Sequence, residues 1–366
     1  MPQIANLVHP SRPAHPLDPA HLDFGKVFSP NFFVADYHNG EWLNARIQRI
    51  EPFSLHPASV VFHYAQTVFE GLKAYRHDDG RIVLFRPELN ARRFQLSTDR
   101  LRIPEIPEAF FLDAVRALVE NERYFVPALP GCMYIRPAVM GVDASLGVKS
   151  SSDFVFWILT LPSGPYFKNA GEGCGAVDVF VAKSTVRSAH GILGSVKAGA
   201  NYAGTLKVTE EAKALGCAQV LFLDSAEHRY IEEMGGMNVM FIENGRRLRT
   251  PPLTDTILNG VTRASLLEIA KDLNLETSEA PITIDEVVAG IKSGGIAEAF
   301  ACGTAAVVVG IRNLKFENGD TLQVGTNCPG TLTRRLYDAL TAIQFGKAPD
   351  KYGWVKEVCQ VELQSA

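Results

Sequence analysis

A stretch rich in proline and glycine divides this chain into two parts. Pro162-Ser163-Gly164-Pro165 is followed closely by Asn169-Ala170-Gly171-Glu172-Gly173. Proline lacks a backbone N–H and glycine has no preferred backbone conformation, so both interrupt helices and strands. With 366 residues the chain is long enough for two separate cores. We predict a small N-terminal domain over residues 1–163, a connection over 164–174 and a larger C-terminal domain over 175–366.

Both parts mix strand-length and helix-length patterns, which favours a mixed α/β fold of the α+β kind. In the first part an irregular arm over residues 1–22 precedes the predicted elements. These are strands at Asn31–Tyr37, Ile47–Leu55, Met133–Gly141 and Phe154–Pro162, a hairpin over Leu72–Phe85, and helices that begin at Pro87 and cover Glu108–Tyr124.

The second part has the same mixture. The predicted strands are Ala176–Ala182, Gln219–Leu223, Met237–Ile242, Ala297–Ala301 and Val307–Ile311. The predicted helices are Tyr202–Leu215, Val261–Asn274 and Leu332–Phe345, with a further amphipathic segment at Ile282–Ser293.

Composition excludes several function classes. A net charge of −4 offers no basic surface for nucleic acid. Apolar runs such as 154–159 are too short to span a bilayer, and no basic segment with an apolar core begins the chain, so we expect a cytoplasmic protein. The cysteines, 6 in number, are scattered without a CxxC pair or a His/Cys cluster, so we expect neither a metal site nor disulfides.

The stretch 194–204 places Lys197 among glycines and alanines, five residues before Tyr202. Small residues allow a flat ligand to approach the backbone closely. A lysine in such a place either is a solvated surface charge or forms a Schiff base with an aldehyde such as pyridoxal 5′-phosphate (PLP). That cofactor also needs an acid for its ring nitrogen and a cradle for its phosphate.

Two stretches offer these partners. Glu232 and Glu233 precede a glycine pair and a strand, so they are either solvated turn residues or a source of the carboxylate for a pyridine nitrogen. Gly260 precedes a predicted helix whose free amides and dipole favour an anion, although a plain helix cap is the alternative. Arg93 either adds a bidentate phosphate contact or is a surface helix arginine.

Substrate recognition has its own candidates. Tyr134 and Arg136 lie two apart on a predicted strand and therefore share a face. Arg136 either binds a substrate carboxylate or makes an internal salt bridge. The turn at Gly303-Thr304-Ala305 either presents backbone amides to the same carboxylate or is only a tight turn.

Taken in order, these blocks resemble the branched-chain amino-acid aminotransferases, which are fold-type IV PLP enzymes, over about residues 24–354. The blocks are Phe69-Glu70-Gly71-Leu72-Lys73-Ala74-Tyr75, Leu84-Phe85-Arg86-Pro87, Tyr134-Ile135-Arg136-Pro137, Ser145-Leu146-Gly147-Val148, Lys197-Ala198-Gly199-Ala200-Asn201-Tyr202, Glu233-Met234-Gly235-Gly236-Met237-Asn238 and Gly303-Thr304-Ala305.

The resemblance implies a role for each matching residue. Lys197 matches the catalytic lysine that forms the Schiff base with PLP. The implied cofactor contacts are Lys197, Arg93, Arg187, Tyr202, Glu233, Val261, Thr262 and Thr304. The implied substrate contacts are Phe28, Tyr64, Phe69, Tyr134, Arg136, Leu146, Val148, Tyr166, Thr304 and Ala305, of which Tyr64, Leu146 and Val148 come from a second subunit.

The resemblance further implies a two-domain fold with a pseudo-barrel in the larger domain, and a homodimer. The implied reaction is ping-pong transfer of the amino group of leucine, isoleucine or valine to 2-oxoglutarate, which gives a 2-oxo acid and glutamate. Two other fold-type IV activities, D-amino-acid aminotransferase and aminodeoxychorismate lyase, remain as alternatives. A non-catalytic PLP-binding protein is a different class, which the intact set of Lys197, Tyr202 and Glu233 disfavours.

Overall fold

The computed structural model describes residues 1–167 and 173–362, which form two compact units. Unit 1 comprises residues 1–166, 196–200 and 343–366, and unit 2 comprises 167–195 and 201–342. The observed units differ from the expected single division near residue 164 in two places. Residues 196–200, around the lysine, and the C-terminal segment belong to unit 1. Part of the expected connection, residues 168–172, lies outside the described residues.

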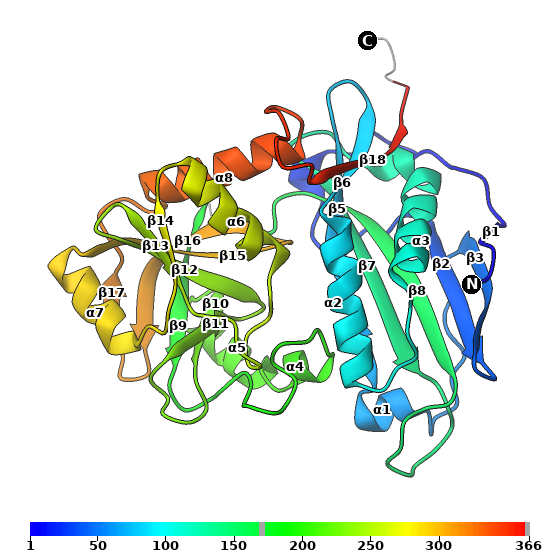
Figure 1. Ribbon diagram of the computed structural model, residues 1–366, viewed down its shortest axis with the longest axis horizontal. Helices are drawn as coiled ribbons and strands as arrows, with labels where there is room; N and C mark the ends of the chain where they lie inside the picture. The colour runs from blue at the N-terminus through cyan, green and yellow to red at the C-terminus, as the bar shows by residue number, and fades with distance from the viewer. Residues whose placement is uncertain (168–172, 363–366) are drawn as a thin grey trace. The chain divides into compact units, whose positions relative to one another are not determined.

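Unit 1 contains a largely antiparallel sheet with strand order β1-β3-β2-β8-β7-β5-β6-β18, and β4 pairs beside β7 (Figure 1). The strands are β1 Ala5–Asn6, β2 Asn31–His38, β3 Glu41–Arg49, β4 Thr67–Phe69, β5 Leu72–Arg76, β6 Arg81–Phe85, β7 Cys132–Gly141, β8 Phe154–Ser163 and β18 Val355–Gln360. The antiparallel pairing of β18 with β6 explains why the C-terminal segment belongs to this unit.

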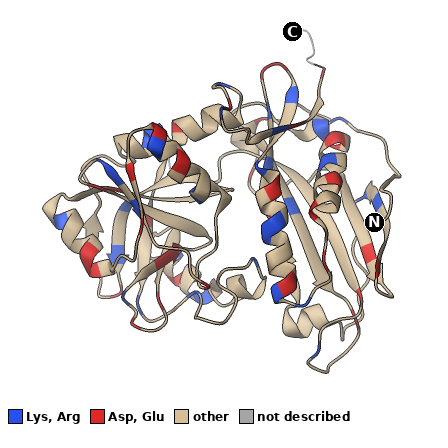
Figure 2. Cartoon of the chain, viewed as in Figure 1, with Lys and Arg blue, Asp and Glu red and all other residues tan. Residues whose placement is uncertain are grey.

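Two helices, α2 (Pro87–Arg100) and α3 (Glu108–Asn121), pack against this sheet (Figure 1). Proline at the first position of α2 fits because that position needs no N–H donor. The apolar sides of the helices enclose a core of buried residues such as Phe94, Phe111 and Phe156. Charged residues of both signs occur along both helices (Figure 2).

The strands of unit 2 close into a barrel. Its sheet has the order β11-β10-β9-β16-β15-β12-β13-β14. The first strand, β11, also pairs with β12, so the strands from β11 to β12 form a closed ring. The strands are β9 Ala176–Ala182, β10 Gln219–Leu223, β11 Ile231–Met234, β12 Met237–Glu243, β13 Arg247–Thr250, β14 Glu276–Glu279, β15 Ile296–Gly303, β16 Val307–Phe316 and β17 Thr321–Gln323. Residues such as Val179, Leu221, Val239 and Ala301 form its core.

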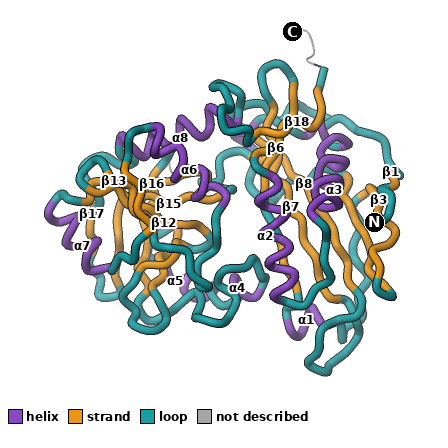
Figure 3. The backbone as a smooth tube through the Cα atoms, viewed as in Figure 1, coloured by secondary structure: helices purple, strands orange, loops and turns teal. Residues whose placement is uncertain are grey.

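Helices cover the outside of this barrel (Figure 3). They are α5 Leu206–Ala214, α6 Val261–Asp272 and α7 Ile284–Ser293. The short α4 Ala200–Ala203 and α8 Thr331–Gln344 are the other helices of this part of the chain. A capping box of Thr283 and Glu286 begins α7, and Gly294 in the left-handed region ends it. The predicted mixed fold with a barrel in the second part is confirmed.

Some predicted elements were wrong in detail. The single helix expected over Tyr202–Leu215 is two helices, since Gly204 and Thr205 separate α4 from α5. The strand expected over Ile47–Leu55 is β3, which begins at Glu41 and ends at Arg49. The α3 helix ends at Asn121 rather than Tyr124, and a short 3₁₀ turn, Arg123–Phe125, follows it.

Candidate active site

The lysine stretch is held in unit 1 by its backbone. Phe69 N–H donates to the carbonyl of Lys197 at 3.0 Å, and Gly199 N–H donates to the carbonyl of Thr67 at 3.1 Å. The amide of Lys197 itself donates to Ser97 Oγ at 3.0 Å. These bonds fix the backbone on both sides of a half-buried lysine whose Nζ lies 5.0 Å from the Phe69 ring centroid. Lys197 is therefore held in place and is not a mobile surface charge.

Arg93 forms a buried ion pair with Glu70. Its Nε donates to Glu70 Oε1 at 2.6 Å and its Nη2 to Oε2 at 2.9 Å. Asn90 Nδ2 and the Gly71 amide also donate to Oε2, at 2.8 and 2.9 Å. Burial raises the pKa of the Glu70 carboxyl, but the charge and hydrogen bonds of Arg93 outweigh burial, and the pKa lies below the ordinary 4.5. Lys197 adds to this lowering of the pKa.

The surface-helix alternative for Arg93 is wrong, because this side chain is buried. Glu70, which orients it, is absent from the residues proposed from the sequence. A signal for it existed, since a glutamate between Phe69 and Gly71 in an apolar hairpin needs a cationic partner once it is buried.

Aromatic rings surround Arg136 in unit 1. Its guanidinium carbon lies 4.6 Å from the Phe69 centroid, and its Nη2 donates to Tyr134 Oη at 3.1 Å. Phe24 makes edge contacts with both Tyr134 and Tyr166, at 4.8 and 5.1 Å between centroids. Phe24 was not proposed from the sequence, because the irregular arm around it carries no periodic pattern to place it.

Arg136 makes no ion pair within residues 1–167 and 173–362, and its buried Nε has no hydrogen-bond partner there. Arg136 therefore does not make the internal salt bridge that the sequence left open as an alternative, within the described residues. A cation edged by aromatic rings and lacking a carboxylate partner is suited to an anionic group of a ligand.

Four of the proposed substrate residues lie at the surface of the chain. Leu146 and Val148 are 66% and 88% exposed, and Tyr64 is also exposed although its hydroxyl donates to the Leu146 carbonyl. Phe28 is exposed and lines a surface hollow along the N-terminal arm. Exposure of three large apolar side chains around one hydrogen bond is typical of an interface with another chain.

In unit 2, Glu233 pairs with Arg187. Arg187 Nη2 lies 2.7 Å from Glu233 Oε2, and both side chains are buried. Asn238 Nδ2 and the Leu258 amide donate to Glu233 Oε1 at 3.0 and 3.2 Å. Glu233 and Asn238 are paired directly across β11 and β12. The solvated-turn alternative for Glu232 and Glu233 is wrong, because both are buried in β11, a strand that the sequence did not predict.

The N-terminus of α6 fits a phosphate. Its first backbone bond closes from Ala264 N–H to the Gly260 carbonyl at 2.9 Å, so the amides of Val261 and Thr262 precede that ladder. No side chain caps the helix, and a Cβ at Gly260 would stand 2.0 Å from Asn238 Oδ1. Glycine is thus required beside Asn238, and the first turn keeps its amides for an anion.

The remaining proposed residues of unit 2 lie in α4 and in the turn between β15 and β16. The Tyr202 ring packs against Gly236, where a Cβ would be 3.4 Å from Tyr202 Cε1. Thr304 and Ala305 form the half-buried turn between β15 and β16. Unit 2 thus contains a buried carboxylate, an arginine and a helix start with free amides.

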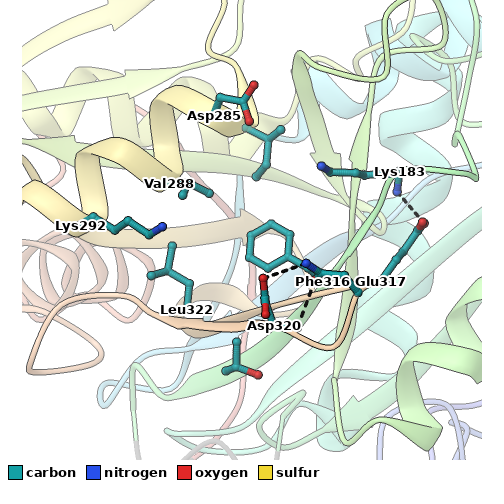
Figure 4. Close-up of a pocket in the computed structure, with 11 residues that line it drawn as sticks. Lys183, Asp285, Val288, Lys292, Phe316, Glu317, Asp320 and Leu322 are labelled. Carbon is teal, nitrogen blue, oxygen red and sulfur yellow. Dashed lines mark hydrogen bonds between the residues drawn. The ribbon is translucent and has the colours of Figure 1, made fainter.

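A separate hollow of unit 2 contains none of these residues. Its lining includes Lys183, Asp285, Lys292, Phe316 and Asp320 (Figure 4). Glu317 there accepts hydrogen bonds from the backbone amides of residues 183 and 184. In the described ranges no group of three or more His, Cys, Asp or Glu side chains could hold a metal ion, and no helix is long and apolar enough to cross a bilayer.

Comparison with known proteins places the chain in a family. Residues 67–314 match the family described as amino-transferase class IV. A branched-chain-amino-acid transaminase 1 of Bacillus subtilis is 42% identical over 343 residues, which are 93% of this chain and 95% of the relative. The crystal structure of a branched-chain amino acid aminotransferase from Escherichia coli is 28% identical, with a TM-score of 0.71, over 89% of this chain and 99% of that one.

A further solved structure, a branched-chain amino acid aminotransferase from Thermobaculum terrenum in its PLP form, shares the fold. It is 23% identical, has a TM-score of 0.72, and covers 92% of this chain and 100% of its own. The family match and these relatives make the chain a PLP-dependent transaminase. The chain belongs to the class IV aminotransferases, and its relatives within that family are branched-chain aminotransferases.

Proposed function

We propose that the chain transfers the amino group of leucine, isoleucine or valine to 2-oxoglutarate, giving the 2-oxo acid and glutamate by a ping-pong mechanism. The observation that carries this choice of substrate is Arg136, a cation without a carboxylate partner in the described residues, set among Phe69, Tyr134 and, through Phe24, Tyr166. Such a surface accepts an apolar side chain against the rings and a carboxylate at the guanidinium. The branched-chain side chain needs the first property and the side-chain carboxylate of 2-oxoglutarate needs the second, so one pocket that takes both substrates must combine them.

PLP, when bound, supplies an aldehyde that condenses with amines and a ring that withdraws electrons from Cα. We propose that Lys197 holds it as a Schiff base. Glu233 keeps the ring nitrogen protonated, and Tyr202 donates to the ring oxygen. Arg93 and the amides of Val261 and Thr262 hold the phosphate. Arg187 holds Glu233 in place through the 2.7 Å contact.

Lys197 has a second task. With the cofactor bound, its Nζ would act as the base that accepts the proton from the substrate Cα and as the acid that returns it. Nζ must be neutral for the first step, because only a neutral amine can accept a proton. Thr304 and Ala305 would present their turn to the substrate carboxylate.

We also propose that the chain acts as a homodimer in the cytoplasm. The exposed apolar side chains of Tyr64, Leu146 and Val148 support a second copy as their partner, to whose substrate site they would contribute. The cytoplasmic proposal is supported by cysteines that are all free in the described residues.

The test is an assay of the purified holoenzyme with L-leucine and D-alanine, each with a 2-oxo acid as acceptor, and with aminodeoxychorismate alone. We expect turnover of L-leucine with 2-oxoglutarate, and loss of that activity in Lys197→Ala. Turnover of D-alanine or of aminodeoxychorismate in place of L-leucine would instead support one of the other fold-type IV activities. Leucine turnover at the wild-type rate by Lys197→Ala would contradict the assignment of the lysine.

A further inference from the structure

The segment Thr254–Leu258, here called the 254–258 segment, joins several parts of the proposed cofactor site within unit 2. The Leu258 amide donates to Glu233 Oε1 at 3.2 Å, and Asn238 Nδ2 donates to the Leu258 carbonyl at 2.9 Å. Arg187 Nη2 donates to the Thr256 carbonyl. The segment therefore contacts both members of the Arg187–Glu233 pair.

The same segment leads to the other functional parts of the chain. Two residues beyond it, Gly260 begins α6, whose first amides are the proposed phosphate ligands. At its centre, the Asp255 carbonyl accepts from the Ser195 amide at 2.9 Å, and Ser195 precedes Lys197 by two residues. A shift of this segment would thus displace the anion-binding turn and the chain that leads into the lysine.

Glu232 holds the segment by a side-chain contact that the proposed mechanism does not use. Thr256 Oγ1 donates to Glu232 Oε1 at 2.6 Å, and Thr254 Oγ1 lies 2.7 Å from Thr256 Oγ1. Glu232 is only 6% exposed, and within the described residues its Oε2 is buried without a hydrogen-bond partner. A buried carboxyl that makes one hydrogen bond is costly to keep ionised.

The charged groups that act on Glu232 oppose each other. Burial, and to a smaller extent Glu233 and Asp224, raise the pKa of its carboxyl, while Thr256 and Arg187 lower it, and the net result is a pKa of about 7. Near neutral pH this carboxyl therefore exchanges a proton, and each exchange changes the charge beside Arg187.

We propose that Glu232 is a positioning residue, which through Thr256 fixes the 254–258 segment for cofactor binding. The proposal rests on the proposed function. It concerns how tightly the protein binds PLP and not which substrate the protein takes. Ionisation of Glu232 tightens the hold on Thr256 Oγ1, since a carboxylate is a stronger acceptor than a carboxylic acid.

The test uses apoprotein titrated with PLP from pH 6 to 8.5. The variants are Glu232→Gln, Glu232→Ala and Thr256→Val, with Thr256→Ser as the matched control that keeps the hydroxyl. We expect Glu232→Ala and Thr256→Val to weaken PLP binding about tenfold at pH 8, which corresponds to about 1.4 kcal/mol for one buried hydrogen bond. Thr256→Ser should bind like the wild type.

The pH profile separates positioning from general stability. In the wild type, affinity for PLP should rise between pH 6 and 8 relative to Glu232→Gln, whose amide does not ionise. The double variant Glu232→Ala/Thr256→Val should bind PLP no more weakly than either single variant, because all three variants lose the same hydrogen bond. Affinities within twofold of the wild type for Glu232→Ala and Thr256→Val at every pH would overturn the proposal.

Should Glu232→Ala fail to fold, Thr256→Val carries the same test, since it removes the contact without changing charge. Absence of PLP binding by the wild-type protein would instead overturn the proposed function, and the role of Glu232 would fall with it.

Discussion

Two buried arginine–glutamate pairs, one in each unit, have different surroundings. In unit 1 the Glu70 carboxylate accepts from both nitrogens of a bidentate Arg93 and from two further donors. In unit 2 Arg187 contacts Glu233 with one nitrogen, Nη2, and its buried Nε has no hydrogen-bond partner among the described residues. Both carboxylates accept from several donors, but the second pair also stands beside another acid, Glu232.

The difference in surroundings indicates a difference in task. Four donors on Glu70 hold its negative charge and orient Arg93 for an anion. Under the proposed function the Glu233 carboxylate also serves the ring nitrogen, and Glu232 places a group of raised pKa near its arginine. The pair in unit 1 is thus a fixed support, whereas the pair in unit 2 has a neighbouring acid that can change its surroundings.

The largest expected effect is on stability in unit 1. Glu70→Ala leaves the Arg93 guanidinium buried without its partner, which we expect to cost about 3–5 kcal/mol of the free energy of unfolding. Denaturant unfolding of the apoprotein measures this loss. The control is Glu70→Ala combined with Arg93→Met, which removes both charges and should recover most of the stability. A loss below about 1 kcal/mol for Glu70→Ala would show that water reaches Arg93.

The next effect is on catalysis in unit 2. Glu233→Gln keeps a hydrogen-bonding side chain but removes the charge that holds the ring nitrogen protonated. We expect kcat to fall about 100-fold or more, as is typical when one preorganised electrostatic contact is lost. Glu70→Gln is the matched variant in unit 1, and its main effect should be on PLP affinity. Equal losses of kcat in both variants would contradict the proposed difference in task between the two pairs.

The two units should also respond oppositely to pH. The pKa of Glu70 is lowered in the folded state, so its contribution to stability is present above pH 4.5 and is lost as pH falls through the folded pKa. The pKa of Glu232 is raised to about 7 from 4.5, so stability is lost as pH rises between these values. Unfolding of the apoprotein at several pH values measures both.

In this pH series, Glu70→Gln should remove the loss of stability at acid pH. Glu232→Gln should remove the change in stability between pH 4.5 and 7. A Glu232→Gln variant whose stability parallels the wild type across that range would contradict the assignment of the raised pKa to Glu232.

The smallest expected effect concerns the exposed apolar surface of unit 1. Leu146→Ser should weaken self-association about tenfold, because it removes apolar area from the proposed interface. Leu206→Ser in unit 2 is a matched control, since the two leucines are 66% and 64% exposed. Sedimentation at several protein concentrations compares them. Equal effects, or none, would place the interface elsewhere.

Prediction from the sequence succeeded where a local pattern determines structure. The Ala176–Ala182 and Gln219–Leu223 strands were predicted with their observed bounds, because short apolar runs between turn signals leave few alternatives. The turn at Asn39-Gly40 joins β2 and β3 with both residues at positive φ, as such a pair favours.

Prediction failed where long-range pairing decides. The β11 strand contains two adjacent glutamates, whose composition indicates a solvated turn, and only closure of the barrel against β10 and β12 buries them. Glu70 and Phe24 were missed for the same reason, since their roles depend on Arg93 and Tyr134, which are distant in the chain. The cofactor and substrate residues were proposed from family resemblance, and the structure gives each of them a local setting.

The most direct test of the central claim is to locate the cofactor on the chain. Reduction of the PLP-loaded protein with borohydride, followed by digestion and mass spectrometry, identifies the lysine that carries the phosphopyridoxyl group. We expect modification of Lys197 alone, with none after prior treatment with L-leucine, which moves the amino group onto the cofactor and frees the lysine. Modification of another lysine, such as the buried Lys73, or of no lysine at all, would contradict it.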